Sequence, residues 1–251
     1  MHSAAILLIG NEILSGKIRD ENASWLAVRL RSLGVNLRRI AVVPDEPDAI
    51  VDELLRVHGQ VDHVFTSGGV GPTHDDVTMD SVARAFGVQV IDHPELAALI
   101  RGWYGDATLP GHLRMARVPE GTVLIAGGDI RWPVCQFHNI FILPGVPQLF
   151  RAKFDAIADR FRTGAFYLRS VFLDADEGEV VDVLRDLEER FPVSVGSYPR
   201  FGDPDHRIRV TVEAREAGPV NAAVDALVAA LAVDAVLRVE APVEAQRLDE
   251  K

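Results

Sequence analysis

A glycine-rich segment followed by two adjacent aspartates constrains this chain more than any other feature. Residues 68–78 read Gly-Gly-Val-Gly-Pro-Thr-His-Asp-Asp-Val-Thr. The preceding run 61–66 is rich in apolar and β-branched residues, and residues 79–86 have a helical pattern that stops before Gly87. The segment therefore predicts a loop between the carboxyl end of a strand and the start of a helix. Such a loop can bind phosphate, because glycines let an anion approach the backbone and a helix start carries partial positive charge.

The glycine spacing fits neither of the two common nucleotide motifs. No Gly-Lys-Ser/Thr follows the loop, and the glycines do not match G-x-G-x-x-G. A purely structural interpretation therefore stays open, in which the glycines form a tight turn and Asp75, Asp76 and Thr78 cap the following helix. The other loops of the same half of the chain favour a binding site.

Apolar strand-like runs alternate with amphipathic helix-like segments over residues 4–161. We expect strands at 4–9, 35–43, 61–66 and 139–143, and helices at 21–33, around 50–57, 79–86, 94–104 and 150–161. Residues 88–135 are less regular, with a loop expected at 106–112 and a short strand at 122–126. Apolar strands separated by helices predict an α/β fold with a mainly parallel sheet flanked by helices.

The pattern changes near residue 164 and predicts a second, smaller α+β domain. Strands are expected at 166–173, 193–198, 207–214 and 236–239, and helices at 179–190 and 220–231. This βαββαβ order is typical of a split βαβ layer. We therefore expect one domain at 1–162 and a second at 165–245.

Composition excludes several classes of partner. The chain has 251 residues and a formal net charge of −11, so it lacks the basic surface that binding to nucleic acid or an anionic membrane normally needs. The apolar run 4–9 is too short to span a bilayer, and we expect a cytoplasmic protein. The single cysteine, Cys135, is expected to be a small buried residue. Scattered histidines favour Mg²⁺, held by carboxylates and ligand phosphates, over zinc or iron.

Four loops of unusual composition, at 10–12, 44–46, 68–78 and 144–147, follow strand ends, where open parallel sheets bind their ligands. They offer backbone N–H groups for phosphate and carboxylates for a metal ion or a water molecule. The candidate ligand-binding residues are Gly10, Asn11, Glu12, Gly68, Gly69, Gly71, Asp75, Thr78, Pro144 and Gly145, and the candidate catalytic and metal-binding residues are Asp45 and Asp76. Each has a plainer interpretation, since an aspartate after proline, such as Asp45, is often a turn or cap residue.

The residues also carry a family resemblance. Residues 68–78, with 44–46 upstream and the Leu-Pro-Gly-Val-Pro turn at 143–147, resemble the molybdopterin-binding domain of the MoaB/Mog superfamily. The opening segment 10–17 and Asn22 are similar to the N-terminal part of competence/damage-inducible protein A (CinA) and to the related domain of FAD synthases. The resemblance extends more faintly to 195–199 in the small domain.

The resemblance implies chemistry at a phosphate anhydride. In Mog-like enzymes the aspartates that match Asp45 and Asp76 act in Mg²⁺-dependent adenylylation of molybdopterin. In CinA-type and FAD synthase relatives the same pocket is associated with hydrolysis of ADP-ribose or FAD. We therefore expect a Mg²⁺-dependent pyrophosphatase that binds a nucleotide or pterin phosphate. Adenylyl transfer to molybdopterin and a non-catalytic binding or scaffold module remain alternatives.

Further expectations come from the same resemblance. Relatives assemble as homo-oligomers, so self-association is expected, either as a dimer or as a trimer. The chain departs from the CinA pattern around 44–46 and at Gln148-Leu149. It also carries neither an amidohydrolase nor an adenylyltransferase domain, so we expect no deamidation of nicotinamide mononucleotide.

Overall fold

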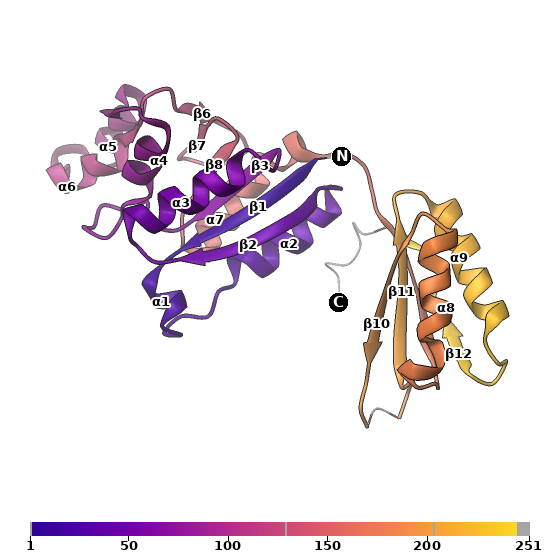
Figure 1. Ribbon diagram of the computed structural model, residues 1–251. Coiled ribbons are helices and arrows are strands. Elements are labelled where there is room, and N and C mark those ends of the chain that lie inside the picture. The colour runs from indigo at the N-terminus through magenta and orange to yellow at the C-terminus, as the bar shows by residue number, and fades with distance from the viewer. Residues whose placement is uncertain (1, 129, 203, 245–251) are drawn as a thin grey trace. The chain divides into compact units, whose positions relative to one another are not determined.

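The computed structural model describes residues 2–128, 130–202 and 204–244. The chain forms two compact units, Met1–Thr163 and Gly164–Lys251. Each unit has its own sheet and its own helices (Figure 1).

The first unit is built on a mainly parallel six-stranded sheet, as the sequence predicts. In spatial order its strands are β2 (Asn36–Val43), β1 (Ser3–Ile9), β3 (His63–Ser67), β8 (Ile140–Leu143), β7 (Val134–Phe137) and β6 (Val123–Ile125). The first four are parallel, and β7 and β6 pair antiparallel at one edge. The carboxyl ends of β1, β2, β3 and β8 therefore share one edge of the sheet.

Helices cover both faces of this sheet (Figure 1). On β1, Ile6 and Leu8 pack into one apolar cluster, whereas Leu7 and Ile9 pack into the other, because successive strand side chains point to opposite faces. The first cluster takes side chains from α2 (Asn22–Ser32) and α7 (Pro147–Asp155), and the second from α3 (Pro47–His58), α4 (Thr78–Phe86) and α5 (Pro94–Tyr104). This double coverage explains why β1 is apolar from Ala4 to Ile9.

Three segments differ from the sequence prediction. The expected loop at 10–12 contains the start of a short helix, α1 (Asn11–Leu14). The expected loop at 106–112 contains η1 (Gly105–Ala107) and α6 (Pro110–Leu113). The last helix of the unit stops at Asp155, and Phe161 lies on the 3₁₀ turn η3 (Ala158–Phe161) while still packing in the first apolar cluster. Apolar spacing marks the buried face, but it does not distinguish a continued α-helix from a 3₁₀ turn.

The irregular region contains three further elements: β4 (Val90–Asp92), β5 (Arg117–Pro119) and η2 (Arg114–Ala116). The β4 and β5 strands form a separate antiparallel pair. The short strand expected at 122–126 is confirmed as β6, and Cys135 is buried on β7, as expected. Burial raises the pKa of its thiol to about 11, so the thiol stays protonated near neutral pH.

The second unit has an antiparallel sheet with two helices (Figure 1). Its elements are β9 (Tyr167–Leu173), α8 (Glu177–Arg190), β10 (Ser194–Pro199), β11 (Ile208–Ala214), α9 (Ala217–Ala230), β12 (Val236–Val239) and β13 (Val243–Glu244). The strand order is β10-β11-β9-β12, and β13 also pairs with β9. A separate apolar cluster joins both helices to the sheet. No helix in the described part of either unit is long and apolar enough to cross a membrane.

Candidate functional site

The glycine loop lies between β3 and α4, as the sequence predicts. The amide of Gly68 donates to the carbonyl of Leu143 at the end of β8, at 3.2 Å. The amide of Thr78 donates to the carbonyl of Gly69 at 3.0 Å, and its hydroxyl donates to the carbonyl of Gly68 at 2.9 Å. Thr78 is fully buried and closes the base of the loop.

Close packing explains two of the glycines. A Cβ atom at Gly68, where φ is +106°, would collide with the backbone carbonyl oxygen of Ile9. A Cβ atom at Gly71 would lie 2.6 Å from Oδ2 of Asp76. The first glycine lets the loop lie against the end of β1, and the second leaves room for the Asp76 carboxylate.

Thr73 holds the acidic end of the loop. Its amide donates to Oδ2 of Asp76 at 2.8 Å, and its hydroxyl donates to the same oxygen. The Thr73 side chain also lowers the pKa of the neighbouring, exposed Asp75 carboxyl. Asp76 itself is half-buried. The loop therefore presents an anchored carboxylate next to its glycines.

Asp45 joins two neighbouring loops. Its Oδ2 accepts a hydrogen bond of 2.8 Å from the amide of Asn11, the first residue of α1. The amide of Gly10 donates to the carbonyl of Val43 at 3.2 Å. The Glu12 side chain folds over Gly10, where a Cβ atom would lie 2.6 Å from its Oε1. The turns after β1 and β2 are thus held together, as their shared sheet edge predicts.

These loops border a cleft of about 540 Å³. Its volume lies within the range of small-molecule sites. The predicted site residues that line it are Glu12, Gly68, Gly69, Gly71, Asp76, Pro144 and Gly145. Gly10, Asn11, Asp45, Asp75 and Thr78 are not among its lining residues. Part of the wall is apolar and is formed by Ile9, Ile13, Ile18, Met115, Val146 and Leu149.

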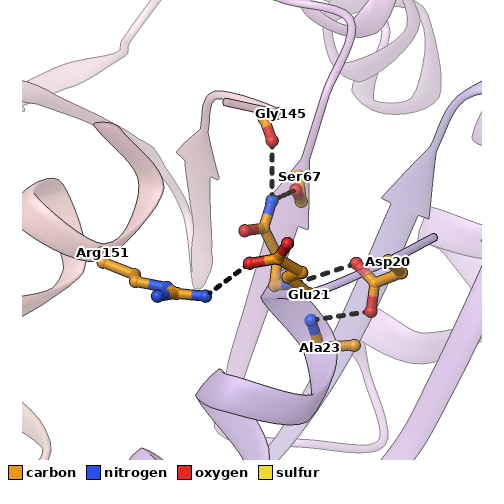
Figure 2. Close-up of polar contacts among 7 residues, drawn as sticks. Asp20, Glu21, Ala23, Ser67, Gly145 and Arg151 are labelled. Atoms are coloured by element: carbon orange, nitrogen blue, oxygen red, sulfur yellow. Dashed lines mark hydrogen bonds and ion pairs between the residues drawn. The ribbon is translucent and has the colours of Figure 1, made fainter. Parts of the chain in front are cut away.

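The start of α2 forms a further wall of the cleft, which Figure 2 shows in detail. The two oxygens of Asp20 accept hydrogen bonds of 3.0 Å from the first backbone amides of α2, those of Asn22 and Ala23. The Asn22 side chain donates from Nδ2 to Oγ of Ser67 at 2.9 Å and to the carbonyl of Gly145 at 2.8 Å. These bonds join α2 to the loops that follow β3 and β8.

Of these residues only Gly145 was predicted as a site residue, whereas Asp20 and Ser67 were not, and Asn22 was named only as part of the family resemblance. A local signal was present, because aspartate and asparagine directly before an amphipathic run are typical of a helix start. That signal indicates a cap, however, and does not identify Ser67 and Gly145 as partners.

A smaller cleft of about 200 Å³ lies beside the same loop. It shares Gly69, Val70, Gly71, Asp76 and Met115 with the larger cleft. Arg114 and Arg117 also line it, and Arg117 forms a 3.3 Å ion pair with Asp80. This side of the loop therefore carries positive as well as negative side chains.

The described residues contain no cluster of three or more histidine, cysteine or acidic side chains suited to a metal ion. One oxygen of Asp45 and one of Asp76 accept the hydrogen bonds given above, and no bond within the described ranges reaches the second oxygen of either. Mg²⁺ usually binds through one or two carboxylates together with substrate phosphates and water. A magnesium ion bound by Asp45, Asp76 and a ligand phosphate therefore stays a prediction, and the described residues form no all-protein metal site.

The sheet, the glycine loop and the cleft define a molybdopterin-binding-type α/β protein. Residues 5–163 match the family described as "Probable molybdopterin binding domain", and the chain belongs to this family. Residues 165–240 match the family "FAD synthase, middle domain". The family resemblance inferred from the sequence is therefore confirmed.

Similar proteins agree with this assignment. A "Probable FAD synthase" of Caenorhabditis elegans is 33% identical over 90% of this chain and 49% of the relative. A "CinA-like protein" of Parasynechococcus marenigrum is 34% identical over 81% of this chain and 52% of the relative. The chain spans about half the length of these relatives.

One solved structure is also similar in fold. It is the protein CinA of Thermoplasma acidophilum, described as being of unknown function, with 32% identity and a TM-score of 0.59. The similarity covers 64% of this chain and 98% of the solved chain.

Proposed function

We propose that the first unit binds a nucleotide or pterin phosphate and hydrolyses its pyrophosphate bond with the aid of Mg²⁺. One observation carries the proposal: the Asp76 carboxylate, anchored by Thr73, lies on the wall of a ligand-sized cleft beside the glycine loop. The "Probable FAD synthase" relative supports it, since FAD contains a pyrophosphate linkage.

Each part of the cleft has a role in this proposal. The backbone amides of the glycine loop bind phosphate oxygens, and the apolar wall contacts a flat ring. The Asp76 carboxylate binds the metal ion or orients the attacking water, and Asp45 keeps the adjacent loop in place through Asn11. Mg²⁺, when bound, neutralises the charge that develops on the phosphoryl oxygens. Water attacks one phosphorus atom, the anhydride P–O bond breaks, and two phosphate monoesters leave.

Adenylyl transfer to molybdopterin is the second candidate reaction. The family description "Probable molybdopterin binding domain" favours it. The same residues serve this reaction, but the phosphate of molybdopterin replaces water as the nucleophile, attacks the α-phosphorus of ATP, and pyrophosphate leaves. A cleft that binds its ligand without turnover is the remaining alternative. Self-association, a cytoplasmic location and the absence of nucleic-acid partners stay predictions.

Purified protein is incubated with Mg²⁺ and ADP-ribose, FAD, NAD or ATP, with and without molybdopterin, and the products are separated by chromatography. We expect cleavage of a dinucleotide to mononucleotides, and Asp76→Asn should lower kcat by at least about 100-fold because a group that stabilises the transition state is lost. Asp45→Asn should lower activity by about 10-fold or more, because it acts through the position of α1. EDTA should abolish activity, and added Mg²⁺ should restore it.

The matched control is Asp155→Asn at the far end of α7, where the carboxylate forms a 2.9 Å ion pair with Arg29. This variant should keep full activity. Product only in the presence of molybdopterin would identify an adenylyltransferase instead. Binding without any product would contradict both reactions.

A further inference from the structure

Asn22 has a hydrogen-bond acceptor without a partner. Only 4% of the residue is exposed, and both described bonds of its amide start from Nδ2. The carbonyl of Gly145 can only accept, so the bond to it requires the amide nitrogen and determines which side-chain atom is the oxygen. The oxygen, Oδ1, is buried and has no hydrogen-bond partner among the residues that the structure describes. Native proteins rarely leave a buried acceptor unpaired, and such exceptions often mark functional positions.

The position of Asn22 indicates what can supply the missing donor. Asn22 lines the larger cleft, and its two partners are Ser67, directly before the glycine loop, and Gly145 of the turn after β8. Its side chain therefore lies next to the loop proposed to bind phosphate. In a nucleotide, the hydroxyl groups of the sugar are the donors closest to the phosphate, and the N–H groups of the base lie beyond the sugar.

We propose that Oδ1 of Asn22 accepts a hydrogen bond from a ribose hydroxyl of a nucleotide bound in the cleft. This inference rests on the proposed function, because it requires the phosphate to lie at the glycine loop. It makes Asn22 a specificity-determining residue that selects ribonucleotides over deoxyribonucleotides. A site with a buried acceptor discriminates against a ligand that lacks the matching donor, since the acceptor then stays unpaired.

The test measures binding of ADP, 2′-deoxy-ADP and 3′-deoxy-ADP in the presence of Mg²⁺ by isothermal titration calorimetry. Wild-type protein should bind ADP about 5- to 10-fold more tightly than one of the two deoxy probes, as expected for one hydrogen bond. In Asn22→Ala this ratio should fall to about one.

Asn139 provides a matched control. Its Nδ2 also donates to two backbone carbonyls, those of His58 and Val61, each at 2.9 Å. It directly precedes β8, and therefore lies at the opposite end of that strand from Gly145. Asn139→Ala should lower the melting temperature and leave the ADP to deoxy-ADP ratio unchanged.

The outcomes separate this inference from the proposed function. If wild-type protein binds ADP and both deoxy probes equally, the role of Asn22 is overturned and the proposed function stands. If Asn22→Ala weakens all three probes by the same factor, Asn22 only holds the cleft together and the inference is likewise overturned. If wild-type protein binds neither these probes nor ADP-ribose or FAD, the proposed function fails as well. Should Asn22→Ala not fold, equal binding of ADP and both deoxy probes by wild-type protein still overturns the inference.

Discussion

Two buried threonines near the glycine loop differ in what their hydroxyl groups bond. Thr78 and Thr66 are both fully buried. The Thr78 hydroxyl donates to the carbonyl of Gly68. The hydroxyl of Thr66, which lies on β3 just before the loop, has no hydrogen-bond partner in the described part of the chain. Substitutions at the two positions therefore compare two contributions to the free energy of unfolding. One comes from a hydroxyl that bonds to the loop, and the other from a hydroxyl that is only buried.

Thr78→Val should lower the free energy of unfolding by about 1–3 kcal/mol, because it removes a donor and leaves a buried carbonyl less well satisfied. Thr66→Val should be neutral or stabilising, since it replaces an unpaired hydroxyl by a methyl group of the same shape. Urea denaturation of the two variants measures the difference. Equal effects would contradict the role given to Thr78.

At the scale of elements, the two helices of the second unit begin differently. Oδ1 of Asp176 accepts from the amide of Gly178 at 3.0 Å, and Oε2 of Glu179 accepts from the amide of Asp176 at 3.0 Å, which forms a capping box at α8. The residue in the same position before α9, Glu216, makes no capping bond with its side chain. The first helix thus has its terminal amides satisfied by a local sequence motif.

Asp176→Ala should destabilise the second unit by about 0.5–2 kcal/mol, because the first amides of α8 lose their acceptor. Glu216→Ala is the matched control and should change stability by less than about 0.5 kcal/mol, as is usual for a surface substitution. Thermal unfolding, monitored by circular dichroism, measures the stability of both variants. A larger loss at Glu216 than at Asp176 would contradict the capping argument.

At the scale of the whole molecule, the apolar clusters follow the division into two units. Two clusters pack on the faces of the first sheet, and the third lies wholly within the second unit. Among the described residues, every member of the third cluster lies at or after Tyr167. Each unit therefore has the buried apolar surface that a domain needs to fold alone.

A fragment of residues 1–163 should fold cooperatively and melt within about 5 °C of the corresponding transition of the full chain, since its core is complete. The boundary matches the division at Thr163 and Gly164. Differential scanning calorimetry of the fragment and of the full chain tests this. A fragment without a cooperative transition would show that the first unit depends on the second.

The sequence by itself determined the α/β class, the order of the main elements and the glycine loop, because apolar periodicity, glycine and proline act within a few residues of chain. It also identified Asp76 and the Gly145 turn, which line the cleft. Only the tertiary structure decided which side chains face that cleft. Asn22 meets Ser67 from 45 residues away and Gly145 from 123 residues away, whereas Thr78 is bonded inside the loop. Such hydrogen-bond partners depend on how distant segments of the chain pack, and a local sequence pattern does not predict that packing.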